Sequence, residues 1–144
     1  MSTEENKGIV ARCWRACFAG DLAVADELVA VDYRWHGPGQ EVDSREGIKL
    51  LITSIRAGFP DVRWEADDQL AEDDKVATRW TARGTHNGAW LDIAPTGQAV
   101  RLSGLVISRL AGGQIAEEWE EFDQLGMLQQ IGAVPAPEHA AAAG

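Results

Sequence analysis

The sequence contains little that suits a metalloprotein, a disulfide-rich scaffold or a membrane protein. Its 144 residues include only two cysteines, Cys13 and Cys17, too few for a structural metal set or a disulfide framework. They lie one helical turn apart in an apolar stripe, which indicates reduced core thiols. No segment approaches the roughly 20 apolar residues of a membrane-spanning helix. Residues 1–5 are acidic where a signal peptide would be basic and then apolar, so we expect a cytoplasmic protein.

Basic residues are also scarce. Thirteen Lys and Arg against 23 Asp and Glu give a net charge of -10. This charge repels phosphate backbones and anionic lipid surfaces over a Debye length of about 8 Å, so nucleic acid and membrane partners are disfavoured. Residues 37–39 (Gly-Pro-Gly) lack the Lys and the helix-opening context of a phosphate loop. We therefore expect no flavin or nicotinamide cofactor.

The composition that remains is that of one globular domain, with 45% hydrophobic and 25% charged residues. A chain of this length supports a single core. Six tryptophans are unusual beside one Tyr and three Phe. Two or three of them are expected to line a cavity, where flat indoles suit a flat polycyclic ligand. Because the Ala/Pro-rich end has no apolar pattern to bury, we predict a domain over residues 1–132 and a mobile tail over 133–144.

The first half of the chain shows helical patterns. Capping-box motifs at residues 2–5 and 43–46 precede apolar stripes of helical period. These helices are predicted to end at Gly20 and near residues 58–60, which contain Gly and Pro. Asp21 is expected to cap a second, short helix between them.

The second half changes to a period of two, which is typical of strands. After a short extended piece near residues 33–36 in the first half, strands are predicted near residues 62–67, 76–86, 98–110 and 114–122. Consecutive hairpins among the last four imply an antiparallel meander. Helices followed by such a sheet predict an α+β fold, a cone-shaped barrel whose strongly curved, mostly antiparallel sheet encloses one apolar pocket. Asp123 is expected to cap a closing helical turn, with a pocket role as the alternative.

Three segments carry a family resemblance: residues 82–88 (ARGTHNG), 95–97 (PTG) and 113–119 (GQIAEEW). In order and spacing they resemble the SnoaL-like polyketide cyclases, within the larger fold group of nuclear transport factor 2 and ketosteroid isomerase. The similarity spans roughly Lys7 to Gly132. It implies an enzyme without cofactor or metal that closes the last ring of an aromatic polyketide by intramolecular aldol condensation. A carboxylate on the final strand would be the general acid/base, and a His on the preceding strand would assist it.

The resemblance places these two roles on particular residues. Counted from residues 113–115, the cyclase Asp falls on Glu120, and counted from residues 103–104, the cyclase His falls on Ser108. The carboxylate is thus retained as Glu, whereas the His is replaced. Because some relatives of the cyclases are cofactor-independent hydroxylase components of aromatic polyketide pathways, hydroxylation is an alternative. A non-catalytic small-molecule binding module of the same fold is another.

Residue alternation groups the candidate site residues on the last strand. Glu118, Glu120 and Phe122 point to one face, which the resemblance identifies as the pocket face. Burial there would raise the pKa of Glu120 toward the pH at which a general acid or base works best. Glu120 and Glu118 are therefore candidate catalytic residues, and Phe122 and Trp80 are candidate substrate contacts. An exposed edge strand is the alternative reading of this acidic segment.

Two histidines and an arginine complete the candidates. His86 is a possible catalytic residue that orients a substrate carbonyl or shuttles a proton, or else a structural residue at the rim. His36 and the adjacent Trp35 are candidate substrate-binding residues. Arg79 would polarise a developing enolate if it faced the pocket, and lies at the surface otherwise. An iron site of the two histidines with Glu120 lacks any supporting ligand spacing.

The opposite face of the sheet suggests a partner. If Ser108 and Glu120 face the pocket, then Leu105, Ile107 and Trp119 face away and form an apolar convex surface. A two-fold homodimer would cover it. The function we predict is general acid/base chemistry by Glu120 on a small hydrophobic aromatic or polyketide-like carbonyl compound.

Overall fold

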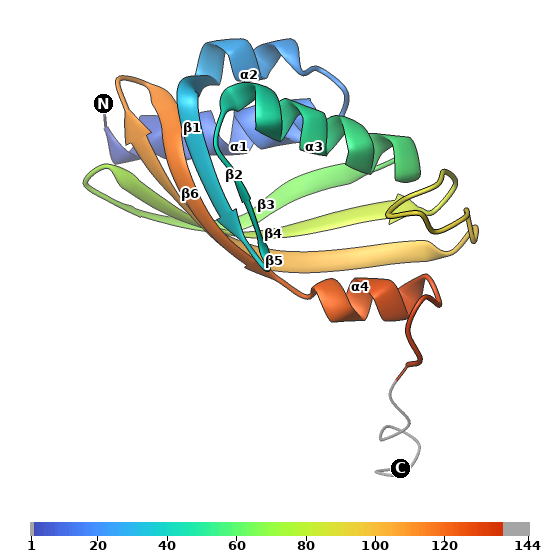
Figure 1. The fold of residues 1–144 in the computed structure, drawn as a ribbon. Helices are drawn as coiled ribbons and strands as arrows, with labels where there is room; N and C mark the ends of the chain where they lie inside the picture. Colours follow the sequence, from blue (N-terminus) through green and yellow to red (C-terminus); the bar gives the residue numbers. More distant parts are fainter. Residues whose placement is uncertain (1, 137–144) are drawn as a thin grey trace, which may run out of the picture.

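The computed structural model describes residues 2–136, in which three helices lie inside a curled six-stranded sheet and a fourth follows the last strand (Figure 1). In chain order the elements are α1 (Thr3–Phe18), α2 (Ala23–Leu28), β1 (Val29–Gly37), β2 (Gln40–Val42), α3 (Arg45–Gly58), β3 (Arg63–Glu72), β4 (Lys75–Thr85), β5 (Ala99–Ala111), β6 (Gln114–Phe122) and α4 (Gln124–Gln130). The predicted α+β class is confirmed, although the sheet curls without closing.

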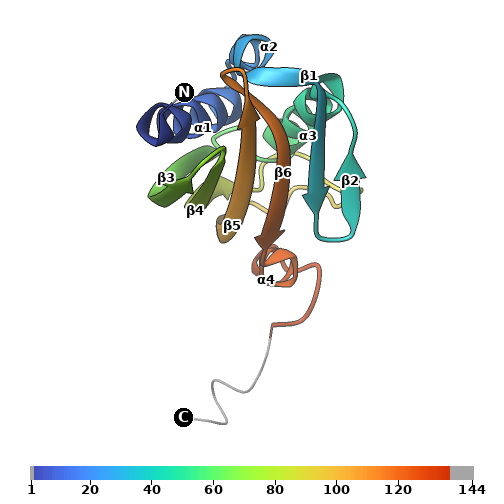
Figure 2. The same ribbon diagram turned by 90° about the vertical axis from the view of Figure 1, so that its left-hand side faces the viewer.

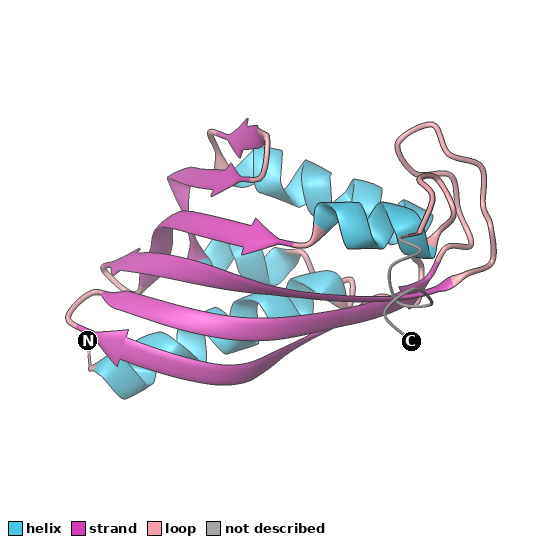
Figure 3. Ribbon diagram, turned by 90° about the horizontal axis from the view of Figure 1, so that it is seen from below, coloured by secondary structure: helices cyan, strands magenta, loops and turns pink. Residues whose placement is uncertain are grey.

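The strand order is β2-β1-β6-β5-β4-β3. Strands β3 to β6 form the predicted antiparallel meander. β1 pairs with β6 in parallel, and the short β2 pairs antiparallel at the edge. α1 packs against β3 and α3 against β1, so α1, α2 and α3 lie together on one face of the sheet (Figures 2 and 3).

Several local signals in the sequence are confirmed. The Ser2 side chain and the Glu5 side chain form both halves of a capping box at the start of α1. α3 ends at Gly58, as predicted. The Asp123 side chain accepts a hydrogen bond from Gly126 N at 2.8 Å and caps α4. Cys13 and Cys17 are buried, reduced residues of α1.

Other boundary predictions are wrong. α2 begins at Ala23 and has no side-chain cap, so Asp21 does not cap it. The cap of α3 is Ser44, whose Oγ accepts from Gly47 N at 3.0 Å, one residue after the predicted Asp43. β2 was not predicted because three residues are too short to show a period. The mobile tail predicted from residue 133 lies mostly outside the described residues.

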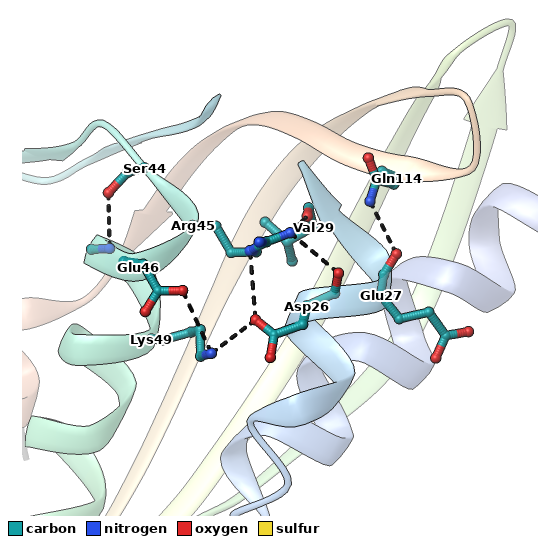
Figure 4. A network of polar contacts seen from close by, with 9 residues as sticks. Asp26, Glu27, Val29, Ser44, Arg45, Glu46, Lys49 and Gln114 are labelled. Atoms are coloured by element: carbon teal, nitrogen blue, oxygen red, sulfur yellow. Dashed lines mark hydrogen bonds and ion pairs between the residues drawn. The ribbon is translucent and has the colours of Figure 1, made fainter. Parts of the chain in front are cut away.

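Polar contacts hold α3 beside the junction of α2 and β1 (Figure 4). Lys49 Nζ lies 2.8 Å from Asp26 Oδ1. Arg45 Nη1 donates to the main-chain oxygens of Asp26 and Val29, at 3.2 and 3.3 Å. Gln114, the first residue of β6, also contacts α2: its Nε2 donates a hydrogen bond to Glu27 O at 3.1 Å. These contacts position α3 over β1, which carries two residues of the site described below.

Buried apolar side chains form two clusters. The larger lies between the inner helices and the sheet, and includes Trp14, Tyr33 and Trp80. The smaller joins the end of α3 to α4 and includes Phe59 and Met127. Both clusters border the same pocket. Within residues 2–136, no helix has the length and apolar character needed to cross a membrane.

Candidate active site

The space between the helices and the concave face of the sheet is a largely apolar pocket of about 420 Å³. This volume lies within the range of about 300–1,000 Å³ common for small-molecule sites. More tryptophans line it than the composition predicted: every one except Trp119 contributes. The two carboxylates of the lining are Glu118 and Glu120, from neighbouring inward positions of β6. The pocket thus combines wide aromatic walls with one acidic pair.

Glu118 lies at the back of the pocket and is only 2% exposed. Its carboxylate accepts hydrogen bonds from Trp14 Nε1 at 3.0 Å, Tyr33 Oη at 2.6 Å and Ser108 Oγ at 2.5 Å. Burial raises the pKa of Glu118, and the three donors act in the opposite direction because they favour its ionised form. The three hydrogen bonds therefore offset part of the cost of burying a Glu118 carboxylate.

Glu120 has a different environment. It is half-buried, and the hydrogen bond to its carboxyl group comes from Trp35 Nε1 at 2.8 Å. Desolvation by the pocket walls, followed by the nearby charge of Glu118, raises the pKa of Glu120 to about 8. Glu120 therefore holds a proton in most molecules at neutral pH. Two neighbouring carboxyl groups in unlike environments are typical of acid/base sites.

The remaining candidates on the inner face either line the pocket or donate a hydrogen bond to one of its carboxylates. Trp35, Trp80 and Phe122 line the pocket. Ser108, which the resemblance aligned with the cyclase His, is fully buried behind the lining and donates to Glu118. The structure thus brings four other candidate residues together around the acidic pair of Glu118 and Glu120: Trp35, Trp80, Ser108 and Phe122.

His86 lies outside this group, at the end of β4, and is fully buried. Its Nδ1 lies 3.0 Å from Thr96 Oγ1 and accepts from Thr96 N at 3.3 Å. Its ring stacks on Phe59, with centroids 5.3 Å apart. These contacts anchor the segment that joins β4 to β5, so the position of His86 suits a structural role.

His36 and Arg79 lie on the outer face of the sheet. His36 Nε2 is 2.7 Å from Glu117 Oε2, a contact that raises the pKa of His36, and its Nδ1 contacts Glu41. Arg79 is 58% exposed and lies 3.6 Å from Asp67. Strand alternation explains both positions, because each follows or precedes an inward-facing tryptophan.

His36, His86 and Glu120 lie in three different places, so this fold does not bring them together as ligands of one iron ion. Among the residues that the structure describes, no cluster of three or more His, Cys, Asp or Glu side chains is placed to hold a metal. This finding concerns geometry alone.

Two functional positions were not predicted from the sequence. Tyr33 precedes Trp35 by two residues, so the period of the strand was a usable signal that both face inward. Trp14 is different, because its contact with Glu118 joins residues 104 apart in the chain. No local pattern in α1 indicates that contact.

Comparison with known proteins agrees with the fold and shows the family. A Catenulispora acidiphila protein with a ketosteroid isomerase-like fold matches at 20% identity, over 86% of this chain and 92% of that one, with a TM-score of 0.71. At that identity the match shows the fold alone. The sequence model of the SnoaL-like polyketide cyclase family matches residues 8–131, and the chain belongs to this family.

Two solved structures from Streptomyces have higher identity. IdmH of Streptomyces antibioticus, a candidate polyketide cyclase, is 34% identical over 88% of this chain and 98% of its own, with a TM-score of 0.78. AclR of Streptomyces galilaeus, a candidate hydroxylase, is 28% identical over 99% of this chain and 90% of its own, with a TM-score of 0.82. No curated protein matches the sequence.

Proposed function

We propose that the protein is an enzyme that transfers protons at a carbon next to a carbonyl group, in an intramolecular aldol-type reaction of an aromatic or polyketide-like substrate. The observation that carries this proposal is the place of the Glu120 carboxyl group, beside Glu118 in an apolar pocket where burial raises the pKa of Glu120 to about 8. The aromatic walls favour a flat, hydrophobic substrate.

In this proposal one residue both removes and returns the proton. Ionised Glu120 takes a proton from an activated methylene, and the resulting enolate carbon attacks a second carbonyl of the same molecule. The protonated Glu120 then returns the proton to the alkoxide oxygen, so no atoms are gained or lost. A pKa near 8 suits both steps, because it lies close to the working pH and makes the carboxylate a stronger base than an exposed Glu.

The pH dependence of the reaction tests this role. If ionised Glu120 starts the reaction, kcat/KM is expected to rise about tenfold per pH unit below the pKa and to level off near pH 8. The measurement is a pH profile with an aromatic β-ketoester whose side chain can close a ring. In Glu118→Gln the midpoint should move to lower pH, because the charge that raises the Glu120 pKa is gone. A profile without an ionisation between pH 6 and 9 would contradict the role of Glu120.

Protein stability should report the same ionisation without any substrate. The folded pKa of Glu120, about 8, lies above the value of about 4.3 expected in the unfolded chain. The folded state therefore binds this proton more tightly, and the associated stability is complete below about pH 4.3 and is lost as the pH rises through 8. Relative to wild type, Glu120→Gln should gain Tm progressively from pH 5 to 8.5. A constant Tm difference across this range would show that Glu120 has an ordinary pKa.

Hydroxylation of a bound aromatic substrate is the second candidate. It is favoured by Ser108, which stands in place of the assisting His and is already hydrogen-bonded to Glu118, and by the similarity to AclR. Molecular oxygen would be the co-reactant: one oxygen atom enters the substrate, and the other leaves as water with two electrons and two protons from a reduced, hydroquinone-type form of the substrate. Turnover that stops under anaerobic conditions supports hydroxylation, whereas unchanged turnover supports the aldol-type reaction. Ligand binding without turnover in either atmosphere supports a binding module.

We also propose that the protein forms a homodimer through the convex face of the sheet. Leu105, Ile107 and Trp119 are 60%, 45% and 39% exposed there, on neighbouring strands. Covering such an apolar surface favours association. Sedimentation should give the mass of a dimer for the wild type and of a monomer for Ile107→Glu. A monomeric wild type at micromolar concentration contradicts this arrangement.

A further inference from the structure

Three tryptophans lie near Glu118 and Glu120, and among them Trp80 has an indole N–H without a hydrogen-bond partner. Trp14 Nε1 donates to Glu118 and Trp35 Nε1 donates to Glu120. Trp80 lines the same pocket and is only 5% exposed, yet its Nε1 has no hydrogen-bond partner within residues 2–136. A buried donor without a partner destabilises the folded state unless something else accepts its hydrogen bond.

The position of the Trp80 ring depends on a glycine. Trp80 of β4 pairs with Gly104 of β5, and a Cβ atom at Gly104 would lie 2.5 Å from Trp80 Cζ2 and 2.8 Å from Cε2. The indole therefore lies over the main chain of β5, in space that any other residue would fill. This arrangement brings it toward β6, the strand that carries Glu120.

Two aromatic rings hold the indole there. Trp64 stacks on Trp80 with ring centroids 6.4 Å apart, and Phe122 lies on β6 with its centroid 6.3 Å away. The Trp80 indole is close enough to Glu120 to lower the pKa of that carboxyl group, but in the ligand-free protein its N–H lies outside hydrogen-bonding geometry with the carboxyl oxygens. The unpaired donor is thus fixed beside the group proposed to move the proton.

We propose that Trp80 Nε1–H donates a hydrogen bond to an oxygen of the bound ligand, the carbonyl oxygen next to the carbon from which Glu120 takes its proton. This inference rests on the proposed function and specifies the substrate as an aromatic ketone or ester that presents this oxygen toward β4. Negative charge develops on that oxygen as the enolate forms. A fixed donor in apolar surroundings stabilises such charge strongly, because it needs no reorganisation and water does not compete. The indole keeps its own proton throughout.

The test compares two bicyclic probes of similar shape, 1-tetralone, which has a carbonyl oxygen, and tetralin, which lacks it. In protein labelled with ¹⁵N, each indole N–H gives its own NMR signal, and Trp80→Phe identifies that of Trp80 by its loss. Saturating 1-tetralone should shift the Trp80 signal downfield, whereas tetralin should not. Trp80→Phe should bind 1-tetralone about 5-fold more weakly, the effect of one hydrogen bond, and tetralin equally well.

A ligand-free control checks the starting state. When the pH is raised through 8, the Trp35 indole signal should follow the ionisation of Glu120, and the Trp80 signal should move much less. Equal movement of both signals would show that Trp80 already bonds to the carboxylate and would overturn the proposal. A Trp80 signal that ignores bound 1-tetralone, or failure of both probes to bind, also overturns it. These readouts need no turnover, so they can fail while loss of activity in Glu120→Gln still supports the proposed function.

Discussion

Replacing Glu120 by Gln is expected to lower kcat about 10²- to 10⁴-fold, the usual contribution of a general acid or base. The amide has nearly the same shape and still accepts from Trp35 Nε1, which donates at 2.8 Å in the wild type, but it cannot take up a proton at neutral pH. Ligand affinity should change little, because the apolar walls that make most of the contact are intact. The measurement is kcat with a ring-closing aromatic β-ketoester, together with probe affinity by titration.

Glu121→Gln is the matched control for this experiment. Glu121 is the adjacent glutamate and is exposed on the outer face of β6, so its replacement should leave kcat unchanged. If Glu120→Gln keeps full activity while remaining folded, the acid/base role fails. If both variants bind probes but neither they nor the wild type turn over any substrate, the binding-module alternative is favoured.

Replacing Glu118 by Ala is expected to lower the free energy of unfolding by about 3 kcal/mol or more, since each of the buried donors it leaves unpaired costs about 1–3 kcal/mol. These donors are Trp14 Nε1, Tyr33 Oη and Ser108 Oγ. For a domain of this size the loss corresponds to a fall in Tm of about 10 °C. Thermal unfolding followed by circular dichroism at pH 7 measures it.

Two further variants separate the loss of the acceptor from the loss of the side chain. Glu118→Gln keeps one acceptor oxygen in the same place, so it should destabilise less than Ala. Glu121→Ala removes an exposed carboxylate from the same strand and should change stability by less than about 0.5 kcal/mol. A Glu118→Ala variant as stable as Glu121→Ala would mean that Glu118 does not anchor the three donors.

Much of the fold could be predicted from local patterns. The periods of α1 and of β4 to β6, together with the turns between them, were enough for the meander and the α+β class. The predicted boundaries of helices and strands were wrong where the local sequence allows more than one boundary. Asp43 and Ser44 can both cap a helix, and the chain uses Ser44, since its side chain reaches Gly47 N. Val29 fits the apolar stripe of α2 and yet begins β1, because β6 is available to pair with it.

The site shows the limit of pattern reading more clearly. Two adjacent residues of a strand point to opposite faces, so the pairs Trp35–His36 and Arg79–Trp80 each offered one pocket residue and one surface residue. The local pattern does not say which member is which. Packing of α1 and α3 on one face settles it, since the large indoles are buried beneath the helices and the charged side chains remain in water.

The sequence by itself determined the types and order of the elements other than β2, the family, and the grouping of Glu118, Glu120 and Phe122 on one face of the last strand. These features depend on residues a few positions apart. The tertiary structure alone decided which buried donors bond to each of the two carboxyl groups and which tryptophan N–H of the site remains unpaired. The physical reason is that burial and hydrogen bonding at this site come from α1, β1, β4 and β5, elements that are distant in the chain and meet only in the folded protein.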